Sequence, residues 1–527
     1  MRIVSPQKAP GGKVKLLGCS GSPMPETNGI EKEVITMEPS HFVAVDFGAE
    51  TGRVMLATLA DEHLELELIH RFPNHQVRML GRLHWDVLEL FRQFKLGLAD
   101  IAQRGFRSLD GIAVDTWGVD YGLLDQDGTL LGYPVSYRDP RTDGQMERVF
   151  RDLSREEIYE ITGIQFMQLN TLFQLVATAE TSPALLAAAG KLLFMPDLFN
   201  YLLTGMACSE LTIASTSQLL DARKRSWADE LFRRLELPRK IMPAIRPTGS
   251  ILGPLLSEIT EETGLETEVV LGSGHDTACA VLAVPAKGSD WAYLSSGTWS
   301  LLGVETSEPI ITSESLSRNF TNEAGYGGTI RFLRNIMGMW LLQRCKRAWE
   351  AEDGREISYD DMVGAAAEAK PFAALFDPDD PSLLHPSDMP ATIAELCQKS
   401  SRRTPQGRGG MVRAIFESLA LKYRHVLTQL EDMRGSPIRV LNVVGGASRN
   451  PLLNQFTADA TGMTVVAGPS EATAAGNALV QALAKGIVSS VADARALVAR
   501  SFELQHYEPQ SKESWDAAYE KARRFFG

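Results

Sequence analysis

The pattern of apolar and polar positions begins with two short apolar runs on either side of a glycine-bearing turn. The first run covers 42–45 and ends at Asp46, and the second covers 54–59. Short apolar runs bounded by turn residues are typical of buried β-strands, and a tight turn between two of them is typical of a hairpin. The sequence therefore predicts a β-hairpin whose turn is the stretch 46–53.

A helical period follows this hairpin. Between 87 and 104 the apolar positions include Leu88, Phe91, Leu96 and Leu98. Apolar residues that recur at helical spacing predict a helix over this stretch. The next segment, 109–132, then repeats the first theme.

In that segment an apolar run ends at Asp115, a turn passes through Gly118, and a second apolar run leads to another turn at 126–128. This order predicts a second strand–turn–strand unit of the same kind as the first.

The C-terminal half follows the same order of elements. The stretch 290–306 has the pattern strand, small-residue turn, strand, and 438–469 has the pattern strand, Gly-Gly turn, helix, strand, with a long amphipathic helix predicted at 411–434. A hairpin-plus-helix unit in both halves predicts a duplicated α/β domain with a ligand cleft between the copies. The repeat is structural and has no short sequence period, which argues against solenoids and propellers.

The predicted domains are three. Residues 1–40 are rich in Gly, Pro and Ser and lack the apolar centre of a signal peptide, so we expect a loosely ordered extension with Met37 as a candidate start. The first α/β domain is expected at 41–288 and the second at 289–527, with the boundary between 286 and 289.

Composition narrows the function classes. The chain has 527 residues, 44% of them hydrophobic, and a net charge of -13 without a basic stripe, which argues against nucleic acid as a partner. Five scattered cysteines suggest neither a disulfide framework nor a zinc site. No apolar run reaches the roughly 18 residues of a membrane span. We therefore expect a cytoplasmic protein without a membrane partner.

Three polar residues stand where a predicted strand turns into a predicted helix. In the stretch LGSGHDTACA, at 271–280, His275, Asp276 and Thr277 follow a Gly-x-Gly turn. Asp276 or Thr277 can cap the helix, because both residue types accept hydrogen bonds from free N–H groups at a helix start. The same group can instead carry chemistry, and this stretch leaves both interpretations open.

Three glycine-bearing turns follow apolar strands, at 46–53, 294–300 and 443–450. Such turns let backbone N–H groups approach a phosphate, and Asp46 at a strand end can hold a hydrated Mg²⁺. Each turn alone can also be a plain hairpin turn. Their distribution over two duplicated domains resembles the arrangement of the sugar kinase, actin and Hsp70 group, which would imply ribonuclease H-like halves with ATP between them.

The chain resembles the FGGY carbohydrate kinases and, within them, the rhamnulokinases. The resemblance covers about 42–470 in the family's order, and DTWGVD, NTLFQL and the pair SSGTWS and NIMG are as a set particular to the rhamnulokinases. The stretches that carry it are VAVDFGAETGRVML, GIAVDTWGVDYGLLD, YRDPRTDG, GIQFMQLNTLFQL, HDTACAV, AYLSSGTWSLLG, NIMGMWLLQR and VVGGASRNPLLNQFTADATG.

The resemblance implies ATP-dependent phosphorylation of L-rhamnulose to L-rhamnulose 1-phosphate, with Asp276 as general base and ATP and Mg²⁺ as cofactors. It implies the following site residues: for the sugar Gly118, His275, Asp276, Thr277 and Asn335; for ATP Ala49, Glu50, Thr51, Gly52, Arg53, Thr298, Gln343 and Gly446; for the metal Asp46. The expected partners are a ketose and ATP, and the expected assembly is a monomer or a weak homodimer.

Structural alternatives stay open for several of these residues. Arg53 can be a surface strand residue, His275 a core histidine, Asn335 the cap of a helix that starts at 336, and Gln343 part of that helix's polar face. Some relatives have Ser in place of Glu50, and a carboxylate beside a triphosphate is repelled unless a cation intervenes or the side chain faces away.

The role of Arg138 and the activity of the protein also have alternative interpretations. Arg138 can reach the sugar or pair with Asp139 or Asp143. For the activity, a kinase for another ketose such as L-fuculose and a non-catalytic sugar or nucleotide sensor of the same fold are the alternatives.

Overall fold

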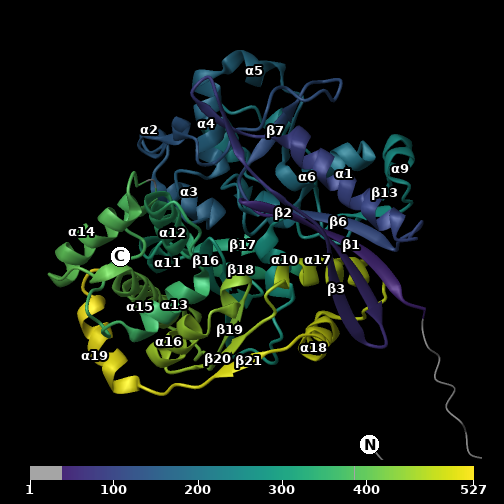
Figure 1. Cartoon of the computed structure of the whole chain (residues 1–527). Coiled ribbons are helices and arrows are strands. Elements are labelled where there is room, and N and C mark those ends of the chain that lie inside the picture. Colours follow the sequence, from purple (N-terminus) through teal and green to yellow (C-terminus); the bar gives the residue numbers. More distant parts are fainter. Residues whose placement is uncertain (1–37, 385, 527) are drawn as a thin grey trace, which may run out of the picture. The chain divides into compact units, whose positions relative to one another are not determined.

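The computed structural model describes residues 38–384 and 386–526. The extension predicted over 1–40 therefore lies, up to residue 37, outside the described residues. The described chain contains two large mixed sheets, one from each half of the sequence (Figure 1).

The first sheet has six strands in the order β13-β14-β6-β1-β2-β3. β1 is antiparallel to β2 and parallel to β6. The central residues of these strands are buried, as expected for strands whose sequences are nearly continuous apolar runs. The hairpin predicted around 46–53 is therefore confirmed. The strands are β1 (Ser40–Phe47), β2 (Thr51–Ala60), β3 (His63–Pro73), β6 (Gly111–Thr116), β13 (Ile251–Pro254) and β14 (Glu268–Val270).

The second sheet has seven strands in the order β17-β18-β16-β15-β19-β20-β21. The β15–β16 hairpin and the strand–turn–helix–strand unit from β19 to β20 are where the sequence predicted them. The strands are β15 (Trp291–Ser296), β16 (Trp299–Thr306), β17 (Thr321–Ala324), β18 (Ile330–Met337), β19 (Val440–Val444), β20 (Thr464–Ala467) and β21 (Gln505–Tyr507).

The two sheets repeat one topology. In the first, the run β3-β2-β1-β6-β14 has two antiparallel pairings followed by two parallel ones. In the second, β18-β16-β15-β19-β20 has the same sequence of pairings. The predicted duplication is confirmed at the level of strand order and direction.

Helices cover these sheets and connect their strands. The helices of eight or more residues are α1 (Val87–Gln103), α3 (Arg155–Thr162), α4 (Thr171–Thr181), α6 (Met195–Thr204), α12 (Trp340–Asp353), α13 (Tyr359–Glu368), α14 (Met389–Ser401), α15 (Gly407–Arg434), α16 (Pro451–Thr461), α17 (Ala472–Ala484), α18 (Val491–Ser501) and α19 (Lys512–Ala522). The shorter ones include α10 (Asp276–Leu282). No described helix combines the length and the hydrophobicity that crossing a bilayer requires.

The unit predicted at 109–132 differs from the structure. β7 (Tyr121–Leu124) does not return along β6 but pairs with β8 (Lys191–Phe194) in a separate ribbon. Both edges of β6 are already occupied, by β1 and β14, so a hairpin partner has no free edge there. A strand–turn–strand pattern alone does not contain this information.

Two predicted helices form, but their buried faces differ from the sequence pattern. In α1 the predicted apolar position Leu98 is buried together with Leu90 and Phe94, whereas Leu88 and Leu96 are 62% and 43% exposed. The helix predicted at 411–434 begins at residue 407, and it is buried on all sides over 411–423, since helices and the second sheet pack around it.

Helices α17 and α18, both from the C-terminal half, contact the first sheet. α17 lies beside α10 and against β1 and β6 (Figure 1). Gln481 donates to the backbone oxygen of Val43 at 2.9 Å, and Asn477 donates to the Asp115 carboxylate at 2.6 Å. The two halves of the sequence are therefore joined by buried polar contacts as well as by apolar packing.

Candidate active site

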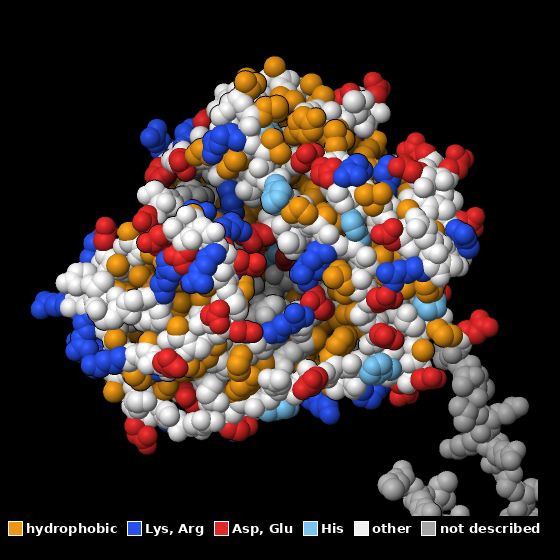
Figure 2. Space-filling model, in the orientation of Figure 1, with side chains coloured by type: hydrophobic (Ala, Val, Ile, Leu, Met, Phe, Trp, Pro, Cys, Tyr) orange, Lys and Arg blue, Asp and Glu red, His pale blue; other side chains and the backbone are white. Residues whose placement is uncertain are grey.

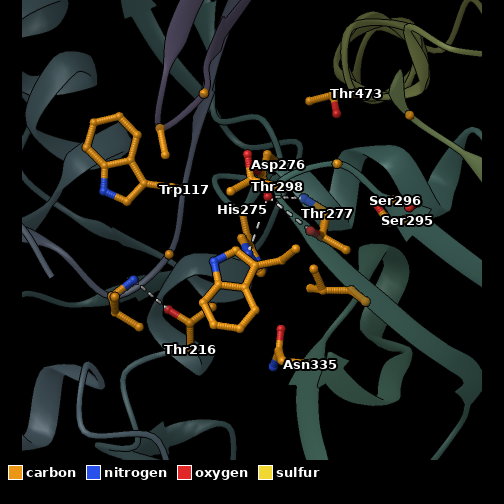
Figure 3. Close-up of a pocket in the computed structure, with 18 of the residues that line it drawn as sticks. Trp117, Thr216, His275, Asp276, Thr277, Ser295, Ser296, Thr298, Asn335 and Thr473 are labelled. Carbon is orange, nitrogen blue, oxygen red and sulfur yellow. Dashed lines mark hydrogen bonds and ion pairs between the residues drawn. The ribbon is translucent and has the colours of Figure 1, made fainter. Parts of the chain in front are cut away.

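The turns predicted to carry chemistry converge on one cavity of about 390 Å³ (Figure 3). It is bordered by the β1–β2 turn, the start of α10, the β15–β16 turn and the turn after β19. The predicted site residues that line it are Asp46, Ala49, Glu50, Thr51, Arg53, Gly118, His275, Asp276, Thr277, Thr298, Asn335, Gln343 and Gly446.

Gly52 is the one predicted site residue that does not line the cavity. A Cβ atom at this position would lie 2.3 Å from the Phe72 ring. Gly52 therefore lets β2 pack closely against the Phe72 side chain on β3, and this packing accounts for the glycine.

Asp276 occupies the first position of α10 and faces the cavity, with 31% of its side chain exposed (Figure 3). The preceding residue, His275, is the N-cap residue and its side chain makes no capping hydrogen bond, but Oδ1 of Asp276 accepts from the backbone N–H of Thr277 at 2.5 Å. One Asp276 oxygen, Oδ1, accepts from the Thr277 hydroxyl at 3.0 Å and lies 3.4 Å from Nε2 of His275. The Asp276 carboxylate is therefore partly held by its neighbours and still open to the cavity.

A chain of charges runs along one side of the cavity. Arg53 lies 3.1 Å from Oδ2 of Asp46 and also pairs with Glu471, which comes from the second half of the chain. Burial raises the pKa of Asp46 to about 6, and the charge of Asp276 adds to this rise while Arg53 opposes it. Burial also raises the pKa of Asp115, the partner of Asp46 on the neighbouring strand.

These carboxylates suit a cation. One buried oxygen of Asp115, Oδ1, has no hydrogen-bond partner among the described residues, and the charges of Asp46 and Asp276 both raise its pKa. Within the described residues no three His, Cys, Asp or Glu side chains form a metal cluster. This set fits Mg²⁺, because that ion usually takes one or two protein carboxylates and leaves its other positions to phosphates and water.

Glu50 forms an ion pair with an arginine side chain of α12. Its Oε1 accepts from the Arg347 guanidinium at 3.0 Å. The repulsion expected between this carboxylate and a triphosphate is thus reduced by a positive charge at the same turn. Arg138, in contrast, stacks over the Trp340 ring at 4.2 Å, while Asp139 pairs with Arg82.

Asn335 lies in strand β18, so its interpretation as a helix cap is wrong. Its backbone N–H and its side-chain amide both donate to Oε1 of Gln165, each at 3.0 Å. Gln343 lies in the first turns of α12 and borders the same cavity.

The sequence did not single out the aromatic residues of the cavity or the carboxylate that holds them. Asp120 is buried and accepts from the indole N–H groups of Trp85 and Trp117, from the backbone N–H of Tyr137 and from the amide of Gln174. Trp117 and Tyr137 line the cavity. The motif DTWGVD contains both Trp117 and Asp120, but only the fold joins them to the other three partners.

A pH-dependent contribution to stability follows from Asp120. Burial raises its pKa to about 6, although its four donors oppose the rise, whereas an unfolded aspartate titrates near pH 3.9. Between these two pH values the folded state keeps a proton on Asp120 that the unfolded chain loses. The contribution of this proton to the free energy of unfolding is therefore full below about pH 4 and is lost as the pH rises through 6. We expect the loss in the free energy of unfolding caused by Asp120→Ala to shrink by on the order of 3 kcal/mol between pH 4 and pH 7.

Urea unfolding at fixed ionic strength measures this difference at each pH. The exposed Asp127, in the turn after β7, supplies the matched control, and Asp127→Ala should show no such trend. A difference for Asp120→Ala that grows as the pH rises would contradict the prediction.

Two further contacts at the cavity came only from the structure. Gly445 has φ of +85°, and a Cβ there would lie 3.0 Å from the Ser296 oxygen, so this glycine lets the turn after β19 lie against the β15–β16 turn. Glu471 pairs with Arg53 and Arg449 at the start of α17. No motif in the sequence pointed to Glu471.

Comparison with known proteins agrees with this architecture. The N-terminal domain model of the FGGY family of carbohydrate kinases matches residues 41–283, and the C-terminal domain model matches residues 292–485. A rhamnulokinase from Bacteroides thetaiotaomicron is 47% identical over 480 residues, which are 91% of this chain and 98% of that protein. A rhamnulokinase from Oceanobacillus iheyensis is 39% identical over 465 residues, 88% of this chain and 97% of that protein.

Solved structures show the same fold at low sequence identity. A ligand-bound xylulose kinase from Lactobacillus acidophilus has a TM-score of 0.75 at 16% identity and covers 92% of this chain and 97% of its own. A glycerol kinase from Plasmodium falciparum with ADP has a TM-score of 0.72 at 15% identity, with coverage of 92% and 98%.

The predicted fold class, two duplicated domains of the sugar kinase, actin and Hsp70 type, is confirmed by these structures and by the repeated strand order. Both family models match, and together they span most of the chain. The chain therefore belongs to the FGGY family of carbohydrate kinases.

Proposed function

We propose that this protein is a rhamnulokinase, which transfers the γ-phosphoryl group of ATP to L-rhamnulose and forms L-rhamnulose 1-phosphate and ADP. The observation that carries the proposal is the meeting, in one cavity, of the Asp276 carboxylate with turns from both duplicated halves. Relatives named rhamnulokinase, similar over about nine tenths of the chain, support the choice of sugar.

Asp276 is the general base in this proposal. It accepts the proton of the sugar hydroxyl as that oxygen forms a bond to the γ-phosphorus and the bond to the ADP oxygen breaks. Its place at the start of α10, where it is open to the cavity, supports this role. Gly118, His275, Thr277 and Asn335 orient the sugar.

ATP is held from both halves. Residues 49–53 contribute from the β1–β2 turn, and Thr298, Gln343 and Gly446 contribute from the second half. Glycine-bearing turns let backbone N–H groups approach phosphates, and this property supports the assignment. A site divided in this way is complete only when both halves contact the nucleotide, which aligns the reactants and excludes water.

Asp46 is the proposed protein ligand of Mg²⁺, and Asp115 lies behind it. A Mg²⁺ ion held there would supply positive charge to offset the charge of the phosphates. The buried position of Asp46 at the end of β1 and its repulsion by neighbouring carboxylates support this assignment.

We also propose limits for the two domains, an assembly and a location. We place the domains at 41–288 and 289–527, since the strands of the two large sheets fall on either side of this boundary. We propose a cytoplasmic monomer or weak homodimer. The four cysteines of the described residues are unpaired, as expected in a reducing compartment.

The test is a coupled assay of ADP release with Mg²⁺, ATP and a panel of ketoses that includes L-rhamnulose, L-fuculose and D-xylulose. We expect the highest kcat/KM with L-rhamnulose. A clear preference for another ketose would change the assigned substrate but keep the kinase. Absence of turnover with every sugar, together with measurable ATP binding, would favour a sensor of the same fold.

A further inference from the structure

A buried ion pair from the second half of the chain contacts His275, the histidine proposed to orient the sugar. Arg331 on β18 and Glu323 on β17 face each other directly in the antiparallel register, with Nη2 and Oε2 3.1 Å apart. Arg331 is fully buried and Glu323 is 5% exposed. His275 belongs to the turn before α10, so the contact joins the two halves.

The atoms of this contact determine which nitrogen of His275 carries the proton. Nη2 of Arg331 lies 3.0 Å from Nδ1 of His275. A guanidinium has only donors, so Nδ1 must accept with its lone pair. A proton on Nδ1 would leave two N–H groups facing each other at this distance.

The other partner of Nδ1 does not change this conclusion. Oε2 of Glu323 lies 3.3 Å from Nδ1 and would require the opposite tautomer. Glu323 instead balances the charge of Arg331, and Arg331 is further held by a 3.0 Å hydrogen bond from Nε to the backbone oxygen of Ala324. A buried charge needs such a partner to remain stable.

We infer that Arg331 is a positioning residue, which holds His275 neutral with its proton on Nε2, so that the ring donates a hydrogen bond into the cavity. Nε2 lies 3.4 Å from Oδ1 of Asp276. The hydrogen bond made by one ring nitrogen sets the role of the other. The N–H at Nε2 of His275 therefore donates a hydrogen bond to an oxygen of the sugar, next to the proposed base Asp276.

This inference rests on the proposed function for the identity of the sugar, but the tautomer itself is measured without turnover. Nitrogen NMR of histidine-labelled protein distinguishes the two ring nitrogens, and the His275 signals are assigned by their loss in His275→Gln. We expect an unprotonated Nδ1 and a protonated Nε2. A proton on Nδ1 of His275 in the parent protein would overturn the inference.

Two variants test the role of Arg331. In Arg331→Met, Glu323 is the partner of Nδ1 that is left among the described residues, so the proton should move to Nδ1. In the double variant Arg331→Met/Glu323→Gln, the new amide can donate to Nδ1 and restore the first tautomer without a buried charge. The double variant also keeps the test valid if the single variant does not fold.

We expect kcat/KM for L-rhamnulose to fall about 10- to 100-fold in Arg331→Met, mainly through KM, while KM for ATP changes less than about 2-fold. The double variant should recover most of this loss. A folded double variant with the restored tautomer but the full loss in kcat/KM would overturn the positioning role. Absence of turnover in the parent would count against the proposed function alone.

A second buried pair supplies the matched control. Arg413 and Glu417, both on α15, are linked by a 2.7 Å hydrogen bond, and neither lines the cavity. Arg413→Met/Glu417→Gln removes the same two charges elsewhere in the second half. We expect its KM for L-rhamnulose to match the parent, and a rise as large as that of Arg331→Met would show a general loss of structure.

Discussion

Replacing Asp276 with Asn should lower kcat by about 10²- to 10⁴-fold and leave binding of the sugar largely intact. The amide keeps the size of the carboxylate and can still accept from the Thr277 hydroxyl, now 3.0 Å from Oδ1. It cannot take up a proton from the attacking hydroxyl. Steady-state ADP release gives kcat, and calorimetric titration with L-rhamnulose gives the affinity.

The same substitution at Asp290 is the control for this measurement. Asp290 is half exposed, immediately precedes β15 and lies 3.6 Å from the Arg439 guanidinium, outside the cavity. Asp290→Asn should retain the parent's kcat. Turnover of Asp276→Asn within a few-fold of the parent would remove Asp276 from the role of base.

Replacing Gly476 with Ala should lower the free energy of unfolding by about 3 kcal/mol, the upper end of the usual cost of overpacking. A Cβ at Gly476 would lie 1.8 Å from the backbone oxygen of Cys279 on α10, much closer than two such atoms can approach. Since the neighbour is backbone, α17 and α10 must separate. Because α10 begins at Asp276, we also expect kcat to fall in protein that remains folded.

Gly364 offers a matched glycine-to-alanine change. It is exposed in the middle of α13, and a Cβ there would meet nothing within 4 Å. Gly364→Ala should stabilise the protein by about 0.5–1 kcal/mol, because alanine favours the helix without a clash. Urea unfolding of both variants measures the contrast, and a mild effect of Gly476→Ala would show that the two helices can separate easily.

Predictions of secondary structure from the sequence were accurate where a short stretch of the chain is enough to specify the element. The hairpins β1–β2 and β15–β16 and the β19–α16–β20 unit follow from short apolar runs and glycine-bearing turns. The family resemblance identified site residues that, except for Gly52, the structure places around one cavity. Their roles are proposals that the variants above test.

Predictions failed where a partner distant in sequence decides. β7 pairs with β8 because β6 has no free edge, and Leu88 is exposed because α1 turns a different face to the sheet. Asp120 accepts hydrogen bonds from residues as far apart in sequence as Trp85 and Gln174. No local sequence pattern predicts that these donors meet at one carboxylate.

The sequence by itself determined the fold class, the duplication and the family, because apolar periodicity, turn residues and motifs are properties of short stretches. The tertiary structure decided which side chains meet: Arg331 with His275, Glu471 with Arg53, and Asn477 with Asp115. Each of these contacts joins residues more than 50 positions apart. Buried charges and amides require partners, but only the packing of the two halves determines which partner each one finds.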